Sequence, residues 1–228
     1  MYPPQIYYAA VSESVDQAKR HGAYSTYQGS PASKGTLAPD FAGVVPHPSL
    51  DWGALRRDVE SYGMRNSLLT AIMPTASTAQ ILGNSESVDP VTTNLYTRRT
   101  LAGTFVVPNK VLKRALGDKY DAAFERFLVE HRGSVQDHPE LDDHTKRVFK
   151  TAWEIKQKAV IDHAARRAPY IDQAQSRSLY FAEVTDAKLS AAIFYAWLKK
   201  LKTGVYYTRT QPKARAAQLS LACESCSA

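Results

Sequence analysis

The spacing of apolar residues predicts two amphipathic helices near the beginning of the chain. The stretch from Ile6 to about Arg20 repeats apolar residues at helical period, and His21-Gly22 ends it. Asp51 can cap a second helix, from Trp52 to about Tyr62, which Gly63 closes. Start and stop signals therefore bound both helices.

Two more helical patterns follow later in the chain. Asp142 or Asp143 starts a long helix, which the restriction on residues before proline stops ahead of Pro169. Thr185 caps a last helix, which ends in lysines and has Gly204 beyond it as a left-handed cap. This last helix leads directly to a tyrosine pair.

Two short apolar runs have the look of buried strands, Ser67–Met73 and Ser178–Ala182. Pro74 follows the first run and begins a new element, a short helix. Strands that alternate with helices predict an α/β fold with parallel pairing.

Length and composition restrict the class of protein. A chain of 228 residues with 44% hydrophobic and 22% charged residues is typical of one large globular domain, or of one domain with an appendage. No apolar run approaches the roughly 18 residues of a membrane span, and the beginning lacks a secretory signal. The net charge of +7 comes from scattered basic residues, so neither nucleic acid nor membrane is the expected partner.

The tyrosine pair is a candidate for one-electron chemistry. Tyr206 and Tyr207 follow Gly204, and a phenol with a pKa of about 10 must lose a proton together with its electron at neutral pH. Neighbouring strand residues point to opposite faces, so two stacked rings require irregular backbone, expected just past a strand end. Packing in a core or an interface is the alternative role of such a pair.

Cys223 and Cys226 are the only cysteines, and a dithiol at this spacing can pass two electrons. They make no disulfide framework, which is typical of a reducing compartment. Half of a zinc site is one alternative, with His138 and His144 as the other half, although Pro139 interrupts that pair. A chain end without function is another.

The turn after the first predicted strand is a candidate anion site. Thr75, Ala76, Ser77 and Thr78 open the short helix, where unpaired backbone N–H groups lie beside hydroxyl groups. The alternative is that Thr75 or Ser77 only caps the helix.

The segment around this turn resembles class I ribonucleotide reductase large subunits. Arg65–Asn84 is similar to the substrate-phosphate segment of that family. Further stretches resemble the family in the expected order, together with the terminal Cys-x-x-Cys: Gln28–Gly35, Thr97–Arg99, Ala152–Ile155, Tyr170–Gln173 and Lys202–Thr210. The resemblance covers nearly the whole chain, and it is to the C-terminal third or so of a large subunit of eukaryotic or viral type.

The resemblance implies a fold and a division into domains. Family members use a ten-stranded α/β barrel made of two half-barrels, with a finger loop that carries the radical cysteine. We therefore expect residues 1–211 to supply the later barrel strands, their helices and a small C-terminal α/β region. Residues 212–228 are expected to form a flexible redox tail.

The resemblance also implies roles for single residues. Thr75–Thr78 fall where the family binds the substrate's diphosphate. Tyr206 and Tyr207 fall on the paired tyrosines of the radical relay, with Tyr206 as the inner one. Cys223 and Cys226 fall on the tail dithiol that re-reduces the active-site disulfide.

Several parts of the family pattern have no counterpart here. The radical cysteine with its neighbouring Asn and Glu, the active-site cysteine pair and the allosteric elements are missing. We therefore expect a chain that is inactive alone and that reduces ribonucleoside diphosphates to 2'-deoxyribonucleoside diphosphates only with the N-terminal remainder of a large subunit. The resemblance implies no metal or other cofactor on this chain, a di-metal small subunit that supplies the radical, thioredoxin or glutaredoxin as reductant, and a cytoplasmic location.

Two other interpretations stay open. The chain is then either a non-catalytic module that docks on or competes for the small subunit, or a relic domain without a redox role. The intact tyrosine pair and dithiol favour the enzyme, because a docking module needs neither.

Overall fold

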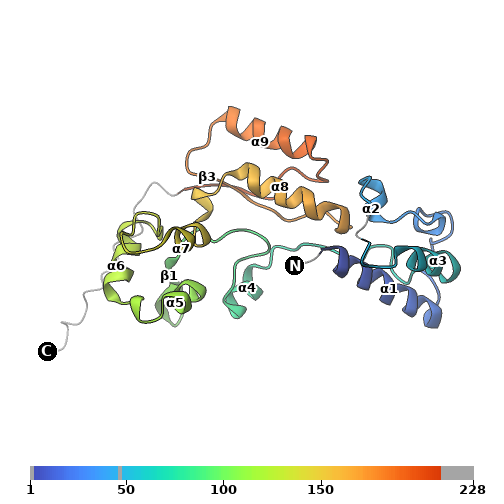
Figure 1. Ribbon diagram of the computed structural model, residues 1–228, viewed down its shortest axis with the longest axis horizontal. Helices are drawn as coiled ribbons and strands as arrows, with labels where there is room; N and C mark the ends of the chain where they lie inside the picture. Colours follow the sequence, from blue (N-terminus) through green and yellow to red (C-terminus); the bar gives the residue numbers. More distant parts are fainter. Residues whose placement is uncertain (1–2, 46–47, 212–228) are drawn as a thin grey trace. The chain divides into compact units, whose positions relative to one another are not determined.

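The computed structural model describes residues 3–45 and 48–211 (Figure 1). These residues form two compact units, which are described one at a time. Unit 1 takes its residues from Met1–Pro74, Lys158–Arg177 and Thr185–Tyr207. Unit 2 takes its residues from Thr75–Gln157, Ser178–Val184 and Thr208–Ala228.

Unit 1 is mainly helical. Its elements are α1 (Pro3–His21), η1 (Ala32–Lys34), α2 (Ala38–Phe41), α3 (Trp52–Tyr62), α8 (Gln157–Arg167), η4 (Ala168–Tyr170) and α9 (Asp186–Leu198). Val11 and Val15 from α1 pack in one apolar core with Leu55 and Val59 from α3. All four side chains are buried, so this pair of helices is stabilised by apolar contact.

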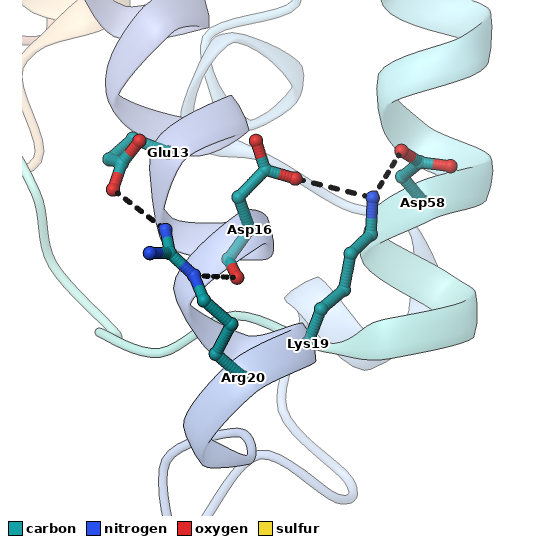
Figure 2. A network of polar contacts seen from close by, with 5 residues as sticks. All are labelled: Glu13, Asp16, Lys19, Arg20 and Asp58. Atoms are coloured by element: carbon teal, nitrogen blue, oxygen red, sulfur yellow. Dashed lines mark hydrogen bonds and ion pairs between the residues drawn. The ribbon is translucent and has the colours of Figure 1, made fainter.

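The solvent side of the same helix pair carries ion pairs (Figure 2). The Lys19 ammonium on α1 lies 3.3 Å from a carboxylate oxygen of Asp16 and 3.3 Å from one of Asp58 on α3. Arg20 lies 3.5 Å from Glu13. Exposed pairs of this kind add little to stability, because water screens them and the side chains lose freedom.

Unit 2 combines short helices with short strands. Its elements are α4 (Ala76–Leu82), β1 (Leu95–Thr100), β2 (Gly103–Pro108), α5 (Lys110–Leu116), η2 (Gly117–Lys119), α6 (Ala122–Glu130), α7 (Asp143–Val148), η3 (Ala152–Glu154), β3 (Leu179–Phe181) and β4 (Thr208–Thr210). Leu112, Phe124 and Leu128 belong to its apolar core. Asn94 lies fully buried beside that core, and its amide donates to the carbonyls of Gly133 and Phe149, each at 2.9 Å.

Strand pairing confirms part of the predicted fold class. β3 and β4 pair in parallel, and Ile72 makes a parallel bridge to Gln175. The antiparallel hairpin of β1 and β2 was not predicted. The described residues contain no closed barrel, since each sheet has two strands.

The prediction of a strand over Ser67–Met73 was wrong in extent. In this run, pairing of the strand type is limited to the bridge at Ile72, where Ser176 donates its N–H to the Ile72 carbonyl at 3.1 Å and Gln173 donates to the Thr70 carbonyl at 3.2 Å. A strand needs several consecutive pairings with a neighbouring strand. In the described residues this run makes a single bridge, from Ile72 to Gln175.

The long helix predicted from Asp142 was also wrong, because it is broken after Phe149. Asp142 does cap α7, accepting from the Thr145 N–H at 2.7 Å. Beyond α7, the Thr151 N–H donates to the Glu154 carboxylate at 2.7 Å and the Ala152 N–H to the Val91 carbonyl at 2.7 Å. These contacts take the donors that a continuous helix would use, so tertiary structure overrides the periodic pattern.

Most predicted helix ends are confirmed, with one correction. Asp51 accepts from the Ala54 N–H at 2.8 Å and starts α3, and Thr185 accepts from the Lys188 N–H at 3.2 Å and starts α9. The left-handed residue after α9 is Lys200, with φ of 57°, and not Gly204. The helix therefore ends earlier than the glycine indicated.

Candidate functional site

The two adjacent tyrosines lie in contact. The ring centroids of Tyr206 and Tyr207 are 4.2 Å apart, with 56° between the ring planes. Both residues are about half exposed, at 46% and 50%. The two phenol rings are therefore in contact with each other and accessible to solvent.

The backbone of the pair is irregular, as ring contact between neighbours requires. Its expected place, just past a strand end, was wrong: the pair precedes β4, which begins at the next residue, Thr208. Because neither tyrosine belongs to the strand ladder, the alternation of side chains along a strand does not apply to them, and their rings can lie in contact.

The loop between α9 and the tyrosines is held by hydrogen bonds to a neighbouring segment of unit 1. The Tyr206 N–H donates to the Arg177 carbonyl at 2.8 Å. The guanidinium of Arg177, which is buried, donates to the Gly204 carbonyl. Lys202 donates from its ammonium to the carbonyl of Ile171 at 2.6 Å and to that of Asp172. Sequence reasoning missed Arg177 and gave Lys202 no role of its own.

Helix α9 presents an apolar face beside this loop. Ile193, Phe194 and Trp197 line an open depression, and each is more than a third exposed. Of the residues of α9, only Ala196 is buried in the part of the chain that the structure describes. Such a face on a helix is typical of a contact surface.

The opposite side of α9 is tied to α8 by a charged cluster. The Tyr195 hydroxyl donates to Asp162 at 2.6 Å, and the Lys158 ammonium lies 2.9 Å from the same carboxylate. The hydrogen bond from Tyr195, then that from Lys158, lowers the pKa of Asp162 to about 2. Asp162 therefore keeps its negative charge across the physiological range.

The candidate phosphate segment lies in unit 2 at the start of α4. Thr75 precedes the helix without capping it, because its hydroxyl accepts from the Ser87 N–H at 2.8 Å. The alternative that Thr75 caps α4 is thus wrong. Ala76, Ser77 and Thr78 are exposed, and the hydroxyl groups of Ser77 and Thr78 make no hydrogen bond within the described ranges. These donors are available to an anion.

The remaining candidates are placed as follows. Cys223 and Cys226 lie outside the described residues. His138 packs its ring against Phe124 and Phe127 in unit 2, at centroid distances of 4.9 and 4.7 Å.

The part of the chain that the structure describes holds no candidate metal site and no candidate membrane segment. No group of three His, Cys, Asp or Glu side chains there is arranged to hold a metal ion. None of the described helices combines the length and the apolar character that crossing a bilayer takes.

The chain is similar to ribonucleotide reductases over almost its whole length. Residues 3–207 match the family described as "Ribonucleotide reductase, barrel domain". The ribonucleoside-diphosphate reductase large subunit of Caenorhabditis elegans is 44% identical over 95% of this chain and 28% of that protein. The large subunits of Plasmodium falciparum and of Variola virus are 48% and 47% identical, over 27% and 28% of their lengths.

A solved structure agrees with the sequence relatives. The class Id ribonucleotide reductase alpha subunit of Actinobacillus ureae is 27% identical, with a TM-score of 0.64, over 92% of this chain and 34% of that one. The chain therefore spans little more than a quarter of the curated relatives and a third of the solved one.

Proposed function

Since the chain belongs to the ribonucleotide reductase barrel-domain family, we propose that it is the part of a ribonucleoside-diphosphate reductase large subunit that binds the substrate's diphosphate and relays the radical. The observation that carries this proposal is the contact between Tyr206 and Tyr207, whose ring centroids are 4.2 Å apart. Reduction replaces the 2'-hydroxyl of the substrate by hydrogen; water leaves, and a dithiol supplies two electrons and two protons as it becomes a disulfide.

The tyrosine pair passes the oxidising equivalent in two steps. The outer phenol, Tyr207, gives up one electron and one proton to the radical of the small subunit. Tyr206 then restores Tyr207 by giving its own electron and proton, and the radical moves on to a cysteine of the complementary chain. Both rings are about half exposed, so an electron acceptor on another chain has access to the pair. The order of the two steps is the one that the resemblance to the family implies.

The segment at the start of α4 binds the diphosphate. Supporting observations are the side-chain cap that is missing at Thr75 and the exposed hydroxyl groups of Ser77 and Thr78. Each hydrogen bond to a charged group is worth roughly 1.5–3 kcal/mol. Replacing both residues by alanine should weaken binding of a nucleoside diphosphate to the complete complex, and unchanged affinity would place the anion site elsewhere.

A complementary chain completes the barrel and supplies the radical cysteine. In unit 1, Leu68 and Met73 flank the extended residues around Ile72, and they are 56% and 64% exposed. Apolar side chains on an unpaired edge favour a neighbour that covers them. The N-terminal portion of a large subunit is the neighbour that this family provides.

Cys223 and Cys226 re-reduce the active-site disulfide after each turnover, and thioredoxin or glutaredoxin restores them. The double serine variant should keep its activity with dithiothreitol, a small reductant that reaches the active site directly. It should lose activity with thioredoxin, and equal activity with both would remove the role of the tail. A cytoplasmic location follows from this need for a reducing compartment.

The relay is tested by Tyr206→Phe and Tyr207→Phe, which keep the ring but remove the phenolic proton. In the complete complex each change should abolish product formation and leave nucleotide binding unchanged. Tyr62→Phe is the matched control, because Tyr62 is 52% exposed and lies on α3. Full activity of either relay variant would overturn the proposed relay.

The second candidate function is a non-catalytic module that docks on the small subunit. The exposed apolar face of α9 favours it, since docking needs only such a surface. The variant Tyr206→Phe distinguishes the two functions. A docking module with this change still binds the small subunit and competes for it, whereas the reductase loses turnover.

A further inference from the structure

The loop that carries the tyrosine pair lies outside the helices and strands. α9 ends at Leu198, and the next strand, β4, begins at Thr208. Lys200 takes a left-handed conformation, with φ of 57°, and turns the chain back. The position of Tyr206 therefore depends on the individual hydrogen bonds that hold the loop.

Lys202 supplies two of these bonds. Its ammonium donates to the Ile171 carbonyl at 2.6 Å and to the Asp172 carbonyl. Burial lowers the pKa of Lys202, and the negative charge of Asp172 acts against that change. A lysine has three donors on a compact head, so it can satisfy two adjacent carbonyls at once.

The segment that accepts from Lys202 is itself fixed on its other side. A carboxylate oxygen of Asp172 accepts from the N–H of Leu69 at 2.7 Å and from that of Thr70 at 3.1 Å. The Thr70 hydroxyl donates to the Tyr170 carbonyl at 3.1 Å. Lys202 thus ties the loop to a segment that is already anchored by charged hydrogen bonds.

We propose that Lys202 is a positioning residue for the tyrosine pair: by holding the loop to the carbonyls of Ile171 and Asp172, it sets where Tyr206 lies. This inference rests on the proposed radical relay. Transfer between groups depends steeply on their placement, and a displacement of about 1 Å can cost roughly 100-fold in rate. In this proposal Lys202 acts on the placement of Tyr206 and takes no part in the transfer itself.

The direct test is amide hydrogen exchange at Tyr206 in the full chain, because its N–H donates to Arg177 within the same loop contact. Lys202→Met should speed exchange there by about tenfold or more, as expected for losing hydrogen bonds from a charged group. Lys200→Met is the matched control: it removes a charge from the same loop, at an exposed residue, and should leave exchange unchanged.

Amides of the α1 core report whether each variant is folded. If Lys202→Met lowers their protection too, Lys202→Ala, which also removes every donor of this side chain, replaces it in the comparison. Unchanged exchange at Tyr206 in a folded Lys202 variant would overturn the inference.

Turnover in the complete complex gives a second reading. Lys202→Met should lower kcat by at least about tenfold with KM for the nucleoside diphosphate within about twofold, and Lys202→Arg should restore part of kcat. A fall in kcat/KM through KM alone, or no rescue by arginine, contradicts a positioning role. Failure of the relay itself is seen separately, as full activity of Tyr206→Phe; the exchange result does not depend on it.

Discussion

The α1–α3 pair and the tyrosine loop, both in unit 1, are held together in opposite ways. Val11, Val15 and Val59 are at most 1% exposed, and the helix pair encloses them in a shared core. The loop leaves both tyrosines about half exposed and is fixed by hydrogen bonds to Arg177, Ile171 and Asp172. The first region is stabilised by its own apolar core, whereas the second is positioned by hydrogen bonds and leaves its rings exposed.

The largest expected difference is in the loss of stability when a leucine is replaced by alanine in the helix core or on α9. Leu55→Ala, in the core at 5% exposure, should lower the free energy of unfolding by about 2–5 kcal/mol. Leu198→Ala, at 55% exposure on α9, should change it by no more than about 0.5 kcal/mol in the isolated chain. Chemical denaturation of both variants checks this, and equal losses would mean that α9 is packed as tightly as α3.

A smaller loss of stability is expected when the ion pair between Arg56 and Asp40 is broken. Arg56 on α3 holds both carboxylate oxygens of Asp40 at 2.7 Å, and each residue is less than a third exposed. Arg56→Met should cost about 1.5–3 kcal/mol, because Asp40 then stays partly buried without its partner. Arg57→Met, on the exposed side of the same helix, is the control.

The same pair predicts a pH dependence. Burial alone would raise the pKa of Asp40, but the hydrogen bonds from Arg56, the Leu37 N–H and the charge of Arg56 together outweigh burial and hold that pKa below its ordinary value. A carboxyl group with a lowered folded-state pKa stabilises the fold above its unfolded pKa of about 4 and loses that contribution as the pH falls. Urea midpoints measured from pH 7 downward should fall less steeply for Arg56→Met than for the unchanged chain; parallel curves would rule out this contribution.

The smallest effect is expected at the exposed network of Figure 2. Lys19→Met removes the contacts to Asp16 and Asp58, but water already screens these groups. We expect no measurable change in the denaturation midpoint at moderate salt. A clear loss that disappears at high salt would show that the network stabilises the helix pair.

The contrast between the regions also explains what the sequence could predict. α1 and α3 were predicted closely, because their caps and apolar period are local signals that agree with the core. The run Ser67–Met73 and the helix after Asp142 were predicted poorly, because their backbone donors and acceptors go to distant residues such as Ser176 and Val91. Local patterns do not contain that information.

At the candidate site, motifs identified the residues but not their supports. The resemblance to the family singled out Tyr206 and Tyr207 as a pair, and the structure shows their rings in contact at 4.2 Å but tilted by 56° where stacked rings were considered. Arg177 carried no signal in the sequence, since an arginine before a strand is ordinarily a surface residue. Its burial and its bond to Gly204 appear only in the fold.

We propose that this chain supplies the substrate-binding and radical-relay part of a reductase whose radical cysteine lies on another chain. The most direct measurement is formation of deoxyribonucleoside diphosphate by this chain, by an N-terminal large-subunit portion and by both together, each with the small subunit and dithiothreitol. We predict product only from the complete mixture, and none when Tyr206→Phe replaces the unchanged chain. Product from this chain without the complementary portion, or an assembled complex that binds nucleotide but forms no product, would contradict the account.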